Sequence, residues 1–219
     1  MSRTLPRNAL AFKRRLLRWF RTVGRDLPWR RTRDPYRILV SEFMLQQTQV
    51  KRVEEFYPRF LERFPTLDAL AAARPGRVRE AWEGLGYYRR AANLHRLART
   101  VVREHGGAVP PDPDALRRLP GVGRYTAGAV ASFAYERRVP AVDTNVARVL
   151  ARVFRPRRGG NGPAHRAVWD LAERLLPASR RTAWEFNQAL MDLGARHCVA
   201  RRPKCGACPV RPACRTGSA

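Results

Sequence analysis

The segment Leu119–Val130 (LPGVGRYTAGAV) constrains this chain of 219 residues more than any other stretch, because two closely spaced glycines separate two helical patterns. The residues before it read as the last turns of a helix, and Thr126–Tyr135 is an Ala-rich run suited to a tightly packed second helix. Gly121 and Gly123 can each adopt positive φ and bring bare backbone close to a ligand. The N–H groups that start the second helix can bind an anion such as phosphate, beside the charge of Arg124.

This pattern predicts a helical hairpin that grips a nucleic-acid backbone without reading bases. An ordinary hairpin of two helices with a glycine turn is the alternative.

The charge of the chain favours a polyanionic partner. There are 44 basic residues against 18 acidic ones, which gives a net charge of +26, far more than solubility needs. Almost all the basic residues are arginine, which suits phosphate recognition. An excess of Arg and Ala also accompanies GC-rich genomes, so part of this bias is not functional.

Two absences in the sequence bear on location. No run of about twenty apolar residues is present, so we expect no membrane span. The N-terminal residues lack the apolar core of a signal peptide. We therefore expect a cytoplasmic, nucleoid-associated protein, in a compartment where structural disulfides are disfavoured.

The apolar periodicity along the chain is helical, and no run alternates convincingly with period two. We therefore predict an all-α fold. A basic loop rich in Gly and Pro is expected at 155–163 and should be the least ordered internal segment. The expected helices cover residues 8–23 (ended by Gly24), 36–60 (with a break near Thr48), 66–73, 78–82, 88–104, 126–135, 143–154, 164–176 and 182–194, with Pro75-Gly76 as a break between two of them.

All four cysteines lie at the C-terminal end, in the order Cys198-x6-Cys205-x2-Cys208-x5-Cys214. Their grouping predicts one site with four thiolate ligands. Such a site holds either a structural zinc ion or a [4Fe–4S] cluster, and the spacing by itself leaves both open.

The hairpin segment, an aspartate about twenty residues after it, and the cysteine motif follow one another in an order that resembles the endonuclease III/MutY superfamily of helix-hairpin-helix DNA glycosylases. The segments 27–50 and 82–91 look most like the MutY adenine glycosylases, and the resemblance covers the chain from about residue 25 onward. It implies a [4Fe–4S] cluster on Cys198, Cys205, Cys208 and Cys214.

The resemblance also implies a two-lobed fold. Residues 25–138 would form a helical barrel lobe with the helix-hairpin-helix, and residues 1–24 plus 139–219 would form the iron–sulfur cluster lobe. We expect a monomer that receives double-stranded DNA containing a mispaired or damaged base in the cleft between the lobes, where Glu42 faces Asp143.

By resemblance, Glu42 corresponds to the general acid of the family and Asp143 to its catalytic carboxylate. Breaking an N-glycosidic bond needs one protonated carboxyl group to assist the departing base and one ionised group to stabilise the cationic sugar. The apolar neighbours of Glu42 could raise its pKa. Taken singly, Glu42 could be a solvated helical acid and Asp143 a helix cap.

The resemblance assigns further roles. An enzyme that acts on a base in a duplex must flip it out, which requires residues that fill the vacated space and residues that line a base pocket. Core packing is the alternative for Tyr88 and Trp29. The resemblance implies a wedge formed by Gln47 and Tyr88, with Gln46 beside it, and it places Tyr125 and Asn145 on either side of Asp143. The implied base pocket consists of Arg25, Leu27, Trp29 and Gln188. The implied DNA-binding residues of the hairpin are Leu119, Gly121, Val122, Gly123 and Arg124.

Position 125 also predicts the reaction type. Bifunctional relatives carry a lysine there that attacks the sugar as an amine, whereas this chain has Tyr125. We therefore expect a monofunctional glycosylase of base excision repair, without strong lyase activity, that removes adenine opposite 8-oxoguanine or guanine.

Two departures keep alternatives open. The MutY proteins carry a further C-terminal domain that recognises 8-oxoguanine, which this sequence does not contain, and they read Asp-Gly-Asn where this chain has Asp143-Thr144-Asn145. Short archaeal relatives remove thymine from G·T mismatches. A thymine or uracil glycosylase acting on G·T or G·U is thus the first alternative, and a non-catalytic DNA-binding module is the second.

Overall fold

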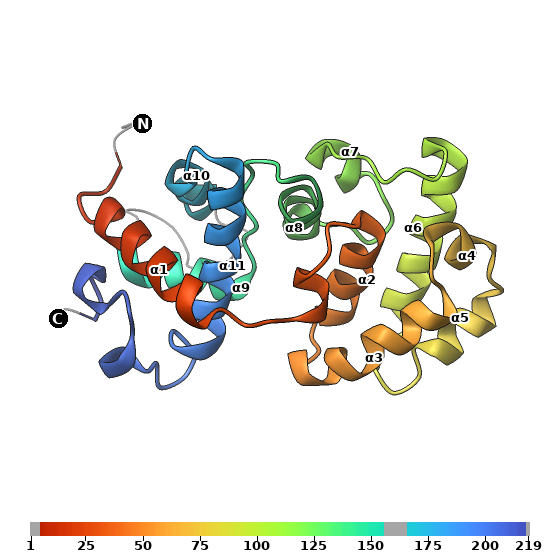
Figure 1. The fold of residues 1–219 in the computed structure, drawn as a ribbon, viewed down its shortest axis with the longest axis horizontal. Coiled ribbons are helices and arrows are strands. Elements are labelled where there is room, and N and C mark those ends of the chain that lie inside the picture. Colours follow the sequence, from red (N-terminus) through yellow and green to blue (C-terminus); the bar gives the residue numbers. More distant parts are fainter. Residues whose placement is uncertain (1–4, 156–165, 218–219) are drawn as a thin grey trace. The chain divides into compact units, whose positions relative to one another are not determined.

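The computed structural model describes residues 5–155 and 166–217. These residues form eleven α-helices and three 3₁₀ turns and contain no β-strand (Figure 1), which confirms the all-α prediction. Among the described helices, none combines the length and the apolar composition that crossing a bilayer requires. Nearly all of the predicted basic loop at 155–163, and the start of the helix predicted at 164–176, lie outside the described residues.

The chain divides into two compact units. One consists of Asp26–Tyr135 and is called the hairpin unit here. The other consists of the residues up to Arg25 together with those from Glu136 onward and is called the cysteine unit.

The hairpin unit consists of a 3₁₀ turn followed by seven helices (Figure 1). Helices α4 and α5 lie beside α6, and α2 packs against α8. These elements are η1 (Pro28–Arg30), α2 (Pro35–Leu45), α3 (Val50–Arg63), α4 (Leu67–Ala72), α5 (Pro75–Ala81), α6 (Arg89–His105), α7 (Pro113–Arg117) and α8 (Arg124–Tyr135).

Local sequence signals explain where these helices begin and end. Asp34 caps α2, because its side chain accepts hydrogen bonds from the backbone N–H groups of Tyr36 and Arg37. The break expected near Thr48 is present: α2 ends at Leu45, and Gln47 follows it with a left-handed φ of 58°. The predicted break at Pro75-Gly76 is wrong, since α5 begins at Pro75, where the missing N–H costs nothing.

The core of the hairpin unit is built around aromatic side chains and one helix of small residues. Trp82 is fully buried and packs edge-to-face on Phe60, with ring centroids 5.7 Å apart. Helix α8 buries an unbroken run from Thr126 to Phe133, composed mainly of Ala, Gly, Ser and Thr. Small side chains let neighbouring helices approach closely, so α8 can lie in the interior beside α2.

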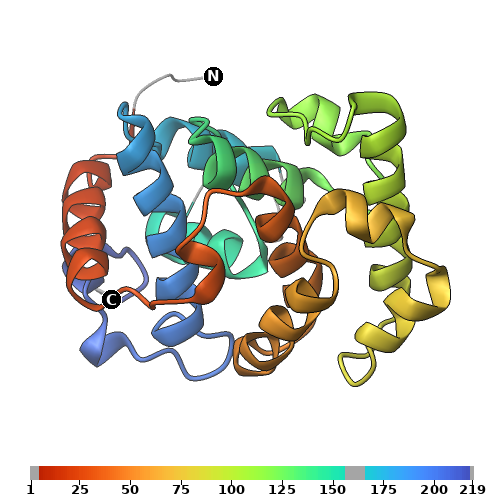
Figure 2. The ribbon, with the colours of Figure 1, turned by 45° about the vertical axis from the view of Figure 1, so that its right-hand side comes forward.

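The cysteine unit joins the two ends of the chain around one core. Phe12 of α1 packs edge-to-face on Phe154 and Phe186, at 5.1 and 6.3 Å between ring centroids. Helix α1 runs beside α11 (Figure 2), and Asn8 donates a hydrogen bond of 2.7 Å to the carbonyl of Ala213. The elements are α1 (Ala9–Val23), α9 (Thr144–Phe154), α10 (Arg166–Leu175), α11 (Arg180–Arg196), η2 (Cys205–Ala207) and η3 (Arg211–Ala213).

The two glycines of the hairpin turn serve different purposes. Gly121 has a φ of +77°, and a Cβ there would lie 2.8 Å from Cβ of Asn93 and 3.0 Å from Phe43. Gly123 does not take positive φ, which corrects the expectation for that residue, and a Cβ there would meet nothing within 4 Å. Gly121 is therefore required by the fold, whereas Gly123 leaves the backbone at the start of α8 open to solvent.

We predict that Gly121→Ala lowers the free energy of unfolding by about 2 kcal/mol or more, because it combines a left-handed φ with a steric clash. Gly123→Ala, its matched control, should change stability by less than about 0.5 kcal/mol. Urea unfolding followed by circular dichroism measures both changes. Equal stability of the two variants would contradict this assignment.

Candidate functional site

The hairpin turn of the hairpin unit exposes backbone and one charge. The side chains of Leu119 and Val122 are buried, so they anchor the turn and only their main chain is available to a ligand. Gly123 and Arg124 are exposed at the N-terminus of α8, and Tyr125 is half-buried in its first turn. N–H groups at such a terminus attract anions.

Glu42 lies in the second half of α2 and is only 4% exposed. Its neighbours Phe43 and Met44 are also buried. A carboxyl group in such surroundings is not a solvated helical acid, so the plainer alternative for this residue is wrong.

The predicted base-pocket residues of the hairpin unit are both buried. Leu27 is 5% exposed and Trp29 is 7% exposed. The ring of Trp29 packs edge-to-face on Tyr57, with centroids 5.6 Å apart. This contact favours the packing interpretation of Trp29, and a role of either residue in a base pocket stays a prediction.

The predicted wedge residues lie on two loops of the hairpin unit. Gln46 and Gln47 form the turn after α2, where Gln47 is left-handed. Tyr88 begins α6 and is 40% exposed, so the core-packing alternative does not hold for it. Tyr87 before it is also left-handed, with a φ of 47°.

A single buried arginine holds both loops. The guanidinium of Arg90 donates to the carbonyls of Phe43 at 3.1 Å and Met44 at 2.6 Å, and also to that of Gln46. It donates further to the carbonyls of Leu85 and Gly86, at 3.2 and 3.1 Å. Arg90 thus satisfies carbonyls at the end of α2, which lack helical partners, and ties that end to the loop preceding Tyr88.

Sequence reasoning missed Arg90, although a signal was present. Within α6, residues 90, 94, 97 and 101 share one buried face at helical spacing. An arginine at such a core position needs several acceptors to offset its burial. Because the chain contains many arginines, only the place of Arg90 on the apolar face of α6 distinguishes it from neighbouring arginines.

In the cysteine unit, Asp143 is held by the helix that it begins. Its Oδ1 accepts a hydrogen bond of 2.6 Å from the backbone N–H of Val146, and its Oδ2 accepts one of 2.9 Å from the side-chain amide of Asn145. The capping role is therefore real. It does not exclude catalysis, because the donors at the N-terminus of α9 hold the carboxylate in a fixed position.

Asn145 links Asp143 to the segment that carries the cysteines. Its Oδ1 accepts a hydrogen bond of 2.6 Å from Arg148, whose Nε donates to the carbonyl of Cys198 at 2.7 Å. Helix α11 approaches closely here, since a Cβ on Gly194 would lie 2.8 Å from Cβ of Asn145. No sequence pattern distinguishes Arg148, and only the packing of α9 on α11 reveals its role.

The other two predicted base-pocket residues belong to the cysteine unit. Arg25 donates from its Nε and backbone N–H to the fully buried Asp192, at 2.8 and 3.0 Å. Gln188 lies on α11 and is 4% exposed. Asp192 therefore fixes Arg25 at the end of α1, and a pocket role for Arg25 and Gln188 stays a prediction.

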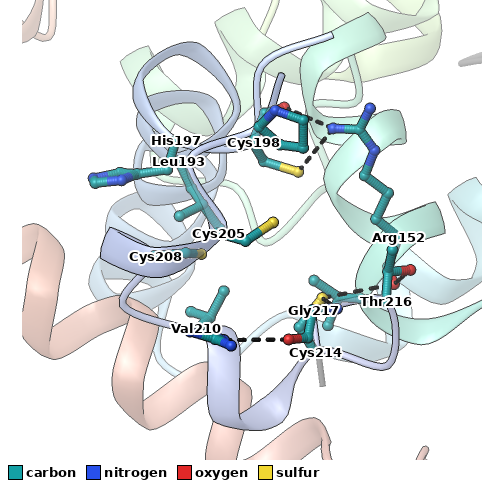
Figure 3. A pocket seen from close by; sticks show the side chains of 13 residues that line it. Arg152, Leu193, His197, Cys198, Cys205, Cys208, Val210, Cys214, Thr216 and Gly217 are labelled. Atoms are coloured by element: carbon teal, nitrogen blue, oxygen red, sulfur yellow. Dashed lines mark hydrogen bonds between the residues drawn. The ribbon is translucent and has the colours of Figure 1, made fainter. Parts of the chain in front are cut away.

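The four cysteines surround one cavity of about 250 Å³ (Figure 3). None of the four forms a disulfide with another described cysteine. Arg152 donates to Sγ of Cys198 at 3.5 Å, and the backbone N–H of Gly217 donates to Sγ of Cys214 at 3.4 Å. Burial raises the pKa of the Cys208 thiol, and the nearby thiols of Cys198, Cys214 and Cys205 raise it further.

These donors fit a thiolate-bound metal cluster. Among the described residues, no three His, Cys, Asp or Glu side chains converge as a single metal ion requires, with sulfurs about 2.3 Å from one centre in the case of zinc. A cluster with several irons, each bonded to one thiolate, needs a wider cavity. N–H donors aimed at the sulfurs stabilise the negative charge of such a site.

Comparison with known proteins places this geometry in context. Residues 40–176 match the model of the HhH-GPD superfamily base excision DNA repair proteins. An adenine DNA glycosylase of Mycolicibacterium smegmatis is 50% identical over 196 residues, which cover 89% of this chain and 66% of that protein. The chain thus spans slightly less than two thirds of that relative.

Solved structures resemble the chain over nearly its whole length. A thermostable thymine-DNA glycosylase has a TM-score of 0.88 and 34% identity, with 96% of this chain and 97% of that one covered. A trapped covalent intermediate of endonuclease III with DNA has a TM-score of 0.82 and 26% identity, with 98% of each chain covered.

We predict that Arg90→Lys lowers the free energy of unfolding by about 2–3 kcal/mol, because one ammonium cannot replace two forked donor groups and leaves buried carbonyls unsatisfied. The matched control is Arg89→Lys at the exposed neighbouring position, which should change it by less than about 0.5 kcal/mol. Urea unfolding of both variants checks this, and similar losses would refute the role of Arg90.

Proposed function

Because the chain belongs to the HhH-GPD superfamily of base excision DNA repair proteins, we propose that it is a monofunctional DNA glycosylase that excises adenine mispaired with 8-oxoguanine or guanine. Its identity of 50% with an adenine DNA glycosylase supports this choice of base. The endonuclease III–DNA structure that it resembles supports duplex DNA as the partner.

The observation that carries the proposal is the environment of Asp143. Its carboxylate sits at the N-terminus of α9 and receives hydrogen bonds from Val146 and Asn145. These two hydrogen bonds fix the orientation of the carboxylate. A fixed negative charge of this kind can stabilise the positive charge that develops on the sugar as the glycosidic bond breaks.

Glu42 supplies the complementary group in the proposed reaction. Its burial disfavours the ionised form, so it can serve as the acid that protonates the departing base. The N-glycosidic bond breaks, and the base leaves with the proton from Glu42. The hydroxyl of an attacking water adds to C1′ of the sugar, and the remaining proton of that water passes to the Glu42 carboxylate, which restores the acid. The products are the free base and an abasic site.

Tyr125 favours water as the nucleophile. The lysines of the chain are Lys13, Lys51 and Lys204, so none lies at or near the hairpin. Without an amine there, a Schiff base with the sugar is not expected, and the strand should stay intact.

The remaining predicted roles complete the proposal. The exposed Tyr88 and the turn at Gln46 and Gln47 would occupy the space of the extruded nucleotide. The base would contact some of Arg25, Leu27, Trp29 and Gln188. The N-terminus of α8, with Gly123 and Arg124, would hold a backbone phosphate.

The four thiols would hold a [4Fe–4S] cluster. When bound, it would supply structure rather than a step of base removal, because protein thiolates occupy its iron ligand positions. Cys198 is also the residue whose carbonyl Arg148 contacts. The cysteine segment therefore helps to orient Asn145 and, through it, Asp143.

A second candidate function is removal of thymine or uracil from G·T or G·U mismatches. The observation that favours it is the resemblance to a thymine-DNA glycosylase over 97% of that chain. The chemistry of Glu42 and Asp143 would be the same, so only the base released separates the two candidates.

We predict adenine release from duplexes carrying A·8-oxoG and A·G, without strand nicking and with little release from G·T or G·U. Asp143→Asn, which keeps a capping side chain, should reduce release by at least about 100-fold and leave duplex affinity within about twofold. The control is Asp170→Asn, an acid of the same unit whose side chain is 41% exposed. Chromatography of released bases and filter binding give both values.

Each other outcome has a clear meaning. Release of thymine or uracil alone would favour the second candidate. Binding of all four duplexes without release would favour the non-catalytic module. Full activity of Asp143→Asn would contradict the role given to Asp143.

We also predict about four iron atoms per chain in the purified protein. Cys205→Ser should lose most of this iron, because it removes one of the four ligands, the exposed one. The control is Thr216→Ser, which changes a residue that lines the same cavity and should keep the iron. Elemental analysis distinguishes iron from zinc. One zinc ion per chain would contradict the cluster.

A further inference from the structure

A groove of about 740 Å³ lies between α5 and α6, entirely within the hairpin unit. Its lining includes Arg79, Arg89, Arg96 and Arg99, together with Tyr88 and His95. Apart from Tyr88, none of these residues has a place in the function proposed above.

The charge of this groove is not balanced by the protein. No acidic residue lines it. In the part of the chain that the structure describes, Arg79, Arg89 and Arg99 form no ion pair, and Arg96 only donates to the side-chain amide oxygen of Asn93. Four guanidinium groups that line one groove without counter-charges repel one another, and a polyanion would relieve that repulsion.

The shape of the groove suits an extended ligand. On α6, residues 89, 92, 96 and 99 share one face, with three arginines around the small, exposed Ala92. Gly76 of α5 adds open backbone, since a Cβ there would meet nothing within 4 Å. The arginines extend over roughly 15 Å of helix, a length suited to several consecutive phosphates of one strand.

His95 supplies a second, independent observation. It lines the groove and is 5% exposed. Its Nε2 is buried and has no hydrogen-bond partner among the described residues. Buried polar atoms are rarely left without a partner, so an additional polar group, from a ligand or a bridging water, is expected beside this ring.

Tyr88 indicates which polyanion binds. Its exposed ring lies at the edge of the groove, with the guanidinium of Arg79 stacked on it at 5.2 Å from the ring centroid. If Tyr88 enters the base stack, as proposed above, the sugar–phosphate backbone beside it must run close to Arg79 and Arg89.

We infer that the groove between α5 and α6 binds consecutive backbone phosphates of the duplex next to the Tyr88 wedge. This inference rests on the proposed function for the placement of Tyr88. It adds a sequence-independent contact surface, separate from the hairpin turn, that extends the DNA footprint along α6.

The test is Arg96→Gln/Arg99→Gln, which removes two groove charges away from Tyr88. For a mismatch duplex, the slope of log affinity against log salt should become shallower by about 2, and Kd near 0.1 M salt should rise by about tenfold. Arg96→Lys/Arg99→Lys should keep the slope of the unmodified chain.

The matched control is Arg15→Gln/Arg18→Gln, which removes two exposed charges with the same spacing from α1. Its salt slope should stay that of the unmodified chain. Duplexes in which single phosphates are replaced by neutral methylphosphonates locate the contact. A few adjacent replacements should weaken binding by the unmodified chain and have no further effect on Arg96→Gln/Arg99→Gln.

An unchanged salt slope in the groove variant, or a change equal to that of the α1 control, would overturn the inference. The groove would bind free phosphate rather than DNA if two results were found together. Inorganic phosphate would raise the Tm of the unmodified chain but not of the groove variant, and the two proteins would show equal slopes of log DNA affinity against log salt. A different result would separate the two proposals. If no duplex released a base, but the groove variant still showed a shallower dependence of log affinity on log salt and no sensitivity to methylphosphonates, the groove contact would stand and the proposed function would be wrong.

Discussion

Backbone groups at helix ends, which have no partner within their own helix, organise both units of this protein. At the end of α2, the guanidinium of Arg90 satisfies the carbonyls of Phe43 and Met44. At the start of α9, the carboxylate of Asp143 satisfies the N–H of Val146. At the start of α8, beside Gly123, the exposed N-terminus is open to an external anion. The proposed chemistry is placed where the helices themselves require polar partners.

The same requirement changes how the arginine content is understood. The net charge of +26 points to a polyanion, but not every arginine is available to one. Arg90, Arg148 and Arg152 turn inward and donate to backbone carbonyls. These bonds hold in place the loop before Tyr88, the side chain of Asn145 on α9 and the segment that contains Cys198. The arginines of this chain therefore stabilise its own loops and helices as well as providing charge for binding a polyanion.

Local signals in the sequence predicted much of the fold because they act over a few residues. The break after α2 and the end of α1 at Gly24 follow from local backbone conformation. Pro75 was misjudged because proline can either break a helix or begin one, and only the path of the chain decides between the two. Gly123 was misjudged because glycine can take either sign of φ, and of the two glycines in this turn only Gly121 is left-handed.

The sequence by itself determined the all-helical fold, the helical hairpin and the grouping of the four cysteines, because motif spacing and helical periodicity are properties of the chain alone. The catalytic roles of Glu42 and Asp143 come from the family resemblance and stay a prediction. Only the tertiary structure decided which polar groups support these residues. The linkage from Asp143 through Asn145 and Arg148 to Cys198 spans more than fifty positions. The groove of α5 and α6 likewise exists only once the two helices pack. Contacts of this kind depend on distances between distant segments, which no local pattern encodes.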